Sequence, residues 1–135
     1  MIGIVVVSHS RALAEAAVAL AEQMVPQESR PQLAVAAGAA DGSFGTDASA
    51  VAAAIEQVDS PDGVLVLLDL GSAVMSAEMA TEFLDPAMAE HVRLSGAPLV
   101  EGLVVALVTA STGATLDKVE SEARNALQAK GKAVG

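Results

Sequence analysis

Hydrophobic residues occur in this chain in two patterns: short continuous runs, and longer stretches in which they recur every three or four positions. The apolar run at 1–7 and the run at 64–68 are each followed by polar residues. A continuous apolar run of this length is typical of a strand buried on both faces of a parallel sheet. We therefore predict two central strands at these positions, with weaker strands at 32–37 and 91–94.

Between these runs the hydrophobic period changes to that of a helix. Apolar residues recur at helical spacing from Ser10 until the following prolines break the pattern, and alanine dominates 47–58. Further helices are expected from Ser72, near 100–110 and from Leu116. The apolar stripes of the first, third and last helices are Leu13, Ala17, Leu20 and Met24; Met75, Met79 and Phe83; and Leu116, Val119, Ala123 and Leu127.

The alternation of strands and helices predicts an α/β fold of three layers, with a mainly parallel sheet and helices on both faces. A chain of 135 residues that is 53% hydrophobic fits one domain, 1–135. With only two phenylalanines as aromatic residues, small aliphatic side chains must fill the core. We predict the flavodoxin-like strand order 2-1-3-4 for the sheet. The Met75 stripe, which consists of Met75, Met79 and Phe83, is expected to be a core or dimer contact. Residues 130–135 are expected to form a frayed tail.

Charge and composition exclude several classes of function. A formal net charge of -10 repels phosphate backbones and anionic membranes, and the chain has no aromatic platform for stacking bases. We therefore expect neither nucleic acid nor a membrane as a partner. No apolar run reaches the roughly 18 residues of a spanning helix, and the absence of cysteine agrees with a cytoplasmic location. With two histidines far apart in the sequence, no metal site is expected.

Polar residues follow both central strands at the point where each strand ends. His9 stands between two serines after the first strand, and Asp69 follows the run at 64–68. In the order 2-1-3-4 the winding direction changes between strands one and three, and a crevice opens at their carboxyl ends. We therefore predict that His9 and Asp69 are neighbours in a site at this edge of the sheet.

The residue types at this edge indicate phosphoryl chemistry on a histidine. An imidazole can attack an activated phosphoryl group with one nitrogen when a carboxylate holds the proton on the other nitrogen. We interpret His9 as the phosphoryl acceptor and donor, and Asp69 as the carboxylate that orients it. Candidate phosphate-binding groups are the hydroxyls and backbone donors of Ser10, Thr46, Gly71 and Ser72.

Alternative interpretations of the same residues are structural. Asp69 is also a suitable turn residue, and Ser72 a suitable helix cap. His91 begins a weak strand without a second polar cluster, so we interpret it as a surface or satisfied core residue. Without a P-loop or a basic clamp, direct use of a magnesium nucleotide is not expected.

Four segments of the chain together resemble a known family. Residues 3–10, 41–46, 63–73 and 97–102 read GIVVVSHS, DGSFGT, GVLVLLDLGSA and APLVEG. In this order they resemble the phosphotransferase subunit of the phosphoenolpyruvate-dependent dihydroxyacetone kinase, a relative of mannose-type enzyme IIA domains. The resemblance spans nearly the whole chain.

The resemblance implies that His9 receives a phosphoryl group from the phosphocarrier protein HPr, with Asp69 as the carboxylate beside it. It further implies transfer to ADP on the nucleotide-binding subunit of the kinase, in support of dihydroxyacetone phosphorylation. A homodimer without a cofactor is implied as well. The chain departs from the family at Ser76, where asparagine is frequent, and at Gly38-Ala39, where two glycines are frequent.

Two other functions stay open at this point. One is a mannose-type enzyme IIA domain that serves a sugar permease. The other is a regulatory module that senses the phosphorylation of HPr and transfers nothing onward. The identity of the phosphoryl acceptor distinguishes the three.

Overall fold

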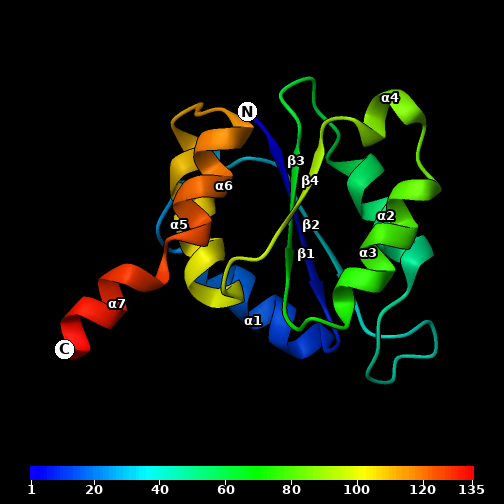
Figure 1. Cartoon of the computed structure of the whole chain (residues 1–135), viewed down its shortest axis with the longest axis horizontal. Coiled ribbons are helices and arrows are strands. Elements are labelled where there is room, and N and C mark those ends of the chain that lie inside the picture. The colour runs from blue at the N-terminus through cyan, green and yellow to red at the C-terminus, as the bar shows by residue number, and fades with distance from the viewer.

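Four parallel strands form the central sheet of the molecule (Figure 1). In the computed structural model, which describes residues 1–135, the strands lie in the order β2-β1-β3-β4. Their bounds are β1 Gly3–Ser8, β2 Leu33–Ala37, β3 Val64–Leu68 and β4 Val92–Ser95. This order confirms the predicted winding and places the change of direction between β1 and β3.

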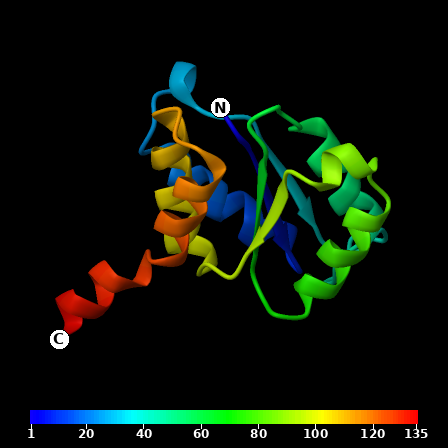
Figure 2. The same cartoon turned by 45° about the horizontal axis from the view of Figure 1, so that its top comes forward.

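Helices cover both faces of the sheet and give the molecule three layers (Figure 2). The helices α1, α5 and α6 pack on one face, and α2 and α3 pack on the other. Two short elements, η1 and α4, have too few residues to show a helical period and were not predicted. The bounds are α1 Arg11–Glu22, the 3-10 helix η1 Gln27–Ser29, α2 Ala48–Gln57, α3 Ala73–Glu82, α4 Pro86–Ala89, α5 Leu99–Ser111, α6 Leu116–Arg124 and α7 Leu127–Val134.

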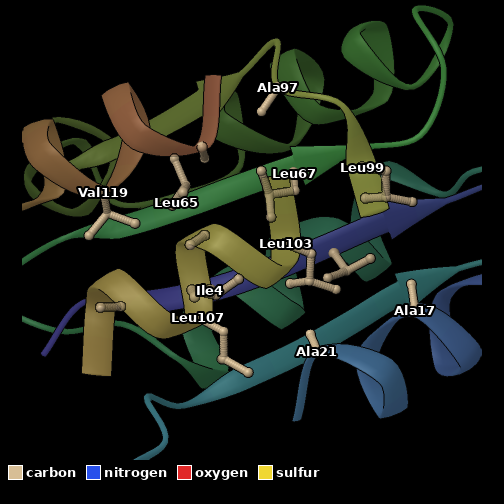
Figure 3. Close-up of a cluster of buried hydrophobic side chains, with 14 of the residues drawn as sticks. Ile4, Ala17, Ala21, Leu65, Leu67, Ala97, Leu99, Leu103, Leu107 and Val119 are labelled. Carbon is tan, nitrogen blue, oxygen red and sulfur yellow. The ribbon is translucent and has the colours of Figure 1, made fainter. Parts of the chain in front are cut away.

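The two central strands supply both hydrophobic cores of the molecule. In β1, Ile4 and Val6 belong to the core under α1 and α5, whereas Val5 and Val7 belong to the core under α2 and α3. All four side chains are fully buried. Figure 3 shows the first core, where Leu103 of α5 packs in the same cluster as Ile4. Since successive strand residues face opposite layers, burial on both faces explains the continuous apolar runs.

Two of the helices, α1 and α3, pack on the sheet through alanine, and not through their largest apolar side chains. The buried residues are Ala14, Ala17 and Ala21 in α1 and Ala73, Ala77 and Ala80 in α3. The core alternative for the Met75 stripe is therefore wrong, because its three side chains are exposed. The large side chains of the first predicted stripe are exposed as well: Leu13, Leu20 and Met24. A methyl side chain lets a helix lie close to the sheet, whereas leucine or methionine at the contact would hold the layers apart. A dimer contact at the Met75 stripe remains a prediction.

The end of the chain forms α7, which projects from the rest of the molecule (Figures 1 and 2). The predicted stripe of the last helix is interrupted, because α6 ends at Arg124 and its cap residue is Asn125. Leu127 is consequently exposed in α7, which buries no residue. Fraying of 130–135 remains a prediction. Neither α7 nor any other helix is long and apolar enough to cross a membrane.

Candidate functional site

The site lies where β1 and β3 end side by side. These two strands are parallel neighbours, and their register pairs Val7 with Leu68. The backbone N–H of Asp69 continues this pairing by donating to the carbonyl of Val7 at 3.1 Å. The residues that follow the two strands, His9 and Asp69, are therefore held together by the sheet itself.

Asp69 binds His9 through both carboxylate oxygens. Its Oδ1 lies 2.9 Å from Nδ1 of the imidazole, and its Oδ2 accepts the backbone N–H of His9 at 2.8 Å. The backbone N–H of Leu70 donates to Oδ1 at 2.7 Å, and the Ser8 hydroxyl donates to Oδ2 at 2.9 Å. Each oxygen thus has two donors, which fix the carboxylate and, through it, the imidazole ring.

These hydrogen bonds set the charge of Asp69. Burial raises the pKa of Asp69, but the hydrogen bonds from His9, Ser8 and Leu70 outweigh burial and hold the pKa below its ordinary value of 3.8. The side chain is 6% exposed, against 25% for His9. An ionised carboxylate at this place accepts a hydrogen bond from Nδ1–H, so the lone pair of the neutral ring lies on Nε2.

The pKa of Asp69 gives a prediction about stability. A carboxyl group whose pKa is lowered by folding stabilises the folded state above its unfolded pKa, and this contribution is lost as the pH falls through the folded pKa. We therefore expect Asp69→Asn to lower the free energy of unfolding near neutral pH, with a difference from wild type that shrinks below about pH 4. Urea denaturation of both proteins across this range measures the difference. A difference that stays constant with pH would contradict the assignment.

Ser72 reaches the other nitrogen of the imidazole from the start of α3. Its hydroxyl lies 2.8 Å from Nε2 of His9. Because Nδ1 carries the ring proton, the hydroxyl donates to Nε2. Ser72 takes the N-cap position of α3, as predicted, but its side chain makes no capping hydrogen bond to the helix. The backbone N–H groups of Gly71 and Ser72 donate to no protein acceptor.

Two candidate phosphate-binding hydroxyls have other partners. Ser10 accepts the backbone N–H of Leu13 at 3.2 Å and caps α1. Thr46 shares a hydrogen bond of 2.6 Å with Ser76, which ties the loop after β2 to α3. The structure therefore brings the side chain of Ser72 to the imidazole, with Gly71 directly before it, whereas the side chains of Ser10 and Thr46 serve the local backbone and loop.

Ser8 has a role that the sequence analysis did not assign. Its side chain is fully buried at the end of β1, and its hydroxyl accepts the backbone N–H of Ser10 while donating to Asp69. A polar residue that continues a buried strand must find hydrogen-bond partners inside the protein. That rule is the sequence signal that points to Ser8.

The second histidine lies at the opposite end of the sheet. His91 directly precedes β4, and its Nε2 lies 2.7 Å from Oδ1 of Asp59. No hydroxyl bonds to its other nitrogen, so His91 lacks the arrangement seen around His9. No group of three or more His, Cys, Asp or Glu side chains in the structure could hold a metal ion.

Comparison with known sequences identifies relatives over most of the chain. The family model EIIA-man, described as PTS system fructose IIA component, matches residues 3–120. The chain is 49% identical to the PEP-dependent dihydroxyacetone kinase, phosphoryl donor subunit DhaM, of Klebsiella michiganensis, and 48% identical to the DhaM subunit of Escherichia coli. These alignments cover 96% and 100% of this chain but only 28% and 29% of the two relatives.

Two further proteins match along nearly their whole length. The phosphoryl donor subunit DhaM of PEP-dependent dihydroxyacetone kinase 2 from Listeria innocua is 33% identical, over 93% of this chain and 98% of the relative. The crystal structure of EF1359, a protein of unknown function, is 34% identical with a TM-score of 0.78 and covers 93% of this chain and 95% of that one. The structural match agrees with the flavodoxin-like sheet described above.

Proposed function

This chain belongs to the mannose-type enzyme IIA family of phosphotransferase system components, and on that premise we propose that it carries a phosphoryl group on His9. The relatives are phosphoryl donor subunits of PEP-dependent dihydroxyacetone kinase, and we propose the same role here. The observation that carries the proposal is the hydrogen bond between Nδ1 of His9 and the buried carboxylate of Asp69. This hydrogen bond holds the ring proton on Nδ1 and leaves Nε2 as the nucleophilic nitrogen.

Phosphoryl uptake begins with attack of the Nε2 lone pair on the phosphorus of phosphorylated HPr. The new N–P bond forms as the N–P bond to the donor histidine breaks, and the ring of His9 acquires a positive charge. The carboxylate of Asp69 stabilises this charge through Nδ1–H. The Ser72 hydroxyl, released from Nε2, donates to a phosphoryl oxygen together with the free amides of Gly71 and Ser72.

Phosphoryl release follows the same path in reverse with a different acceptor. A terminal phosphate oxygen of ADP, held by the nucleotide-binding subunit of the kinase, attacks the phosphorus, and the N–P bond to His9 breaks. The product ATP then phosphorylates dihydroxyacetone on the kinase. The imidazole of His9 is partly exposed at the strand ends, which allows both partner proteins to approach it. We also propose that two copies of this chain form a homodimer, as the family resemblance implies.

The proposal is tested by intact-protein mass spectrometry after incubation with phosphoenolpyruvate, enzyme I and HPr. We expect an acid-labile gain of one phosphoryl group, followed by its loss and formation of ATP when ADP and the nucleotide-binding subunit are added. Gain without transfer to ADP would favour a sugar-uptake or regulatory role. No gain, with HPr shown to be phosphorylated, would overturn the carrier function.

A further inference from the structure

Ser72, His9 and Asp69 form a continuous chain of hydrogen bonds. The Ser72 hydroxyl lies 2.8 Å from Nε2 of the imidazole, and Nδ1 lies 2.9 Å from Oδ1 of the carboxylate. An imidazole held between a hydroxyl and a buried carboxylate is the arrangement that activates a serine as a nucleophile. We propose that Ser72 of the unphosphorylated protein accepts acyl groups from neutral activated esters, so that the site is a slow esterase as well.

The Ser72 hydroxyl is available for this reaction. The residue is exposed, and its side chain makes no capping bond to α3, so its only hydrogen bond is the one to Nε2. The hydroxyls of Ser10 and Thr46 are engaged elsewhere, with the backbone of α1 and with Ser76. Among the serines and threonines near the site, Ser72 is therefore the one whose hydroxyl contacts the imidazole.

Two backbone donors at the start of α3 are available to stabilise negative charge on the ester. The N–H groups of Gly71 and Ser72 have no protein acceptor, and they stand at the positive end of α3. The space around Gly71 is open, since a Cβ added there would meet no atom within 4 Å. An ester carbonyl can thus approach these amides without displacing a side chain.

A cavity whose wall includes Gly71, the residue before Ser72, indicates the class of ester. It has a volume of about 480 Å³, and Asp69, Leu70 and Gly71 form part of its wall. Its apolar lining includes Val74 of α3 and Leu94 of β4, and its charged lining residues are the acids Asp69 and Glu78, without any lysine or arginine. This lining favours a neutral ester with a short aliphatic acyl chain over an anionic substrate.

The proposed reaction conserves atoms and charge. Oγ of Ser72 bonds to the acyl carbon while its proton moves to Nε2 of His9, and the carbonyl oxygen becomes an anion near the two free amides. The bond to the leaving alcohol then breaks, and that alcohol takes the proton from Nε2. A water molecule repeats both steps on the acyl-serine, which releases the carboxylic acid and restores Ser72.

This inference rests on the geometry of the unphosphorylated site and not on the proposed carrier function. A phosphoryl group on Nε2 would remove the lone pair that accepts the serine proton, so the two reactions exclude each other. The test below contains no phosphoryl donor. Its failure therefore leaves the carrier function untouched, and failure of the carrier function leaves this inference untouched.

The test uses the full chain with two probes, p-nitrophenyl butyrate and an ethyl fluorophosphonate. We expect release of p-nitrophenol above the rate in buffer, and a fluorophosphonate adduct that peptide mapping assigns to Ser72. Ser72→Ala should lose both signals, and His9→Ala and Asp69→Asn should slow adduct formation by about 100-fold or more. The matched controls Ser111→Ala and His91→Ala, both remote from the site, should behave as wild type.

Circular dichroism and thermal unfolding of each variant separate lost reactivity from lost structure. Adduct formation at a residue other than Ser72 would overturn the proposal. So would p-nitrophenol release that survives Ser72→Ala, because the imidazole would then be acting alone. Labelling of Ser72 at the wild-type rate in His9→Ala would overturn it as well, because the serine would then react without its base.

Discussion

The His9→Ala variant is expected to gain no phosphoryl group when it is incubated with phosphoenolpyruvate, enzyme I and HPr. The chain contains two histidines, and His9 is the one whose ring is oriented by a buried carboxylate at the strand ends. Removing the imidazole removes the nucleophile, and no other side chain of the site supplies a nitrogen. Intact-protein mass spectrometry before and after acid treatment measures the loss.

His91→Ala is the matched control for this variant. Its imidazole also contacts an aspartate, Asp59, but at the opposite end of the sheet and through Nε2. We expect uptake by His91→Ala to equal that of wild type. Acid-labile uptake by His9→Ala would contradict the assignment and would transfer the role to another residue. Thermal unfolding of both variants checks that the fold is retained.

The Asp69→Asn variant is expected to take up the phosphoryl group about 1,000-fold to 10,000-fold more slowly than wild type. The substitution keeps the size of the side chain but removes its charge. An amide that donates to Nδ1 favours the ring tautomer with the proton on Nε2, which has no lone pair for attack. The charge that stabilises the phosphorylated ring is lost as well. Rapid-quench measurement of a single turnover with phosphorylated HPr gives the rate.

Asp59→Asn is the corresponding control, because it changes the carboxylate that contacts His91 and leaves His9 untouched. Its uptake rate should match wild type. A rate for Asp69→Asn within about threefold of wild type would show that Asp69 is a turn residue and not an orienting carboxylate. The pH dependence of stability described above checks independently that Asp69 is charged in the folded protein.

The strands and their order were predictable because their signal is local and strong. The runs at 1–7 and 64–68 are apolar at successive positions, and only burial on both faces of a sheet explains such a run. The order followed from the short chain and the handedness of strand crossovers. The same argument placed His9 beside Asp69, and the two side chains are in contact in the structure.

The buried faces of α1 and α3 were not predictable from hydrophobicity. Periodicity identified α1 and α3 as helices, but it could not show whether the stripe of Met75, Met79 and Phe83 was a core or a dimer contact. The structure buries the alanines of α1 and α3 instead. The distance between a helix and the sheet decides this choice, and that distance depends on both layers at once.

Side-chain contacts within the site were likewise only partly predictable. Sequence position placed Ser10, Thr46, Gly71 and Ser72 near the strand ends, but it could not distinguish a hydroxyl that faces the imidazole from one that caps a helix. Ser72 contacts Nε2, and Ser10 caps α1. Rotations about the side-chain bonds decide between these partners, and those rotations respond to neighbours that are distant in the chain.

The sequence by itself determined the parallel sheet, its strand order and the meeting of an imidazole with a carboxylate at one edge. These features depend on burial and chain connectivity, which act on runs of residues. The tertiary structure alone decided which helical faces are buried, that Ser8 supports Asp69, and that Ser72 donates to Nε2. These features depend on contacts between single atoms of separate segments, and such contacts exist only once the layers have packed together.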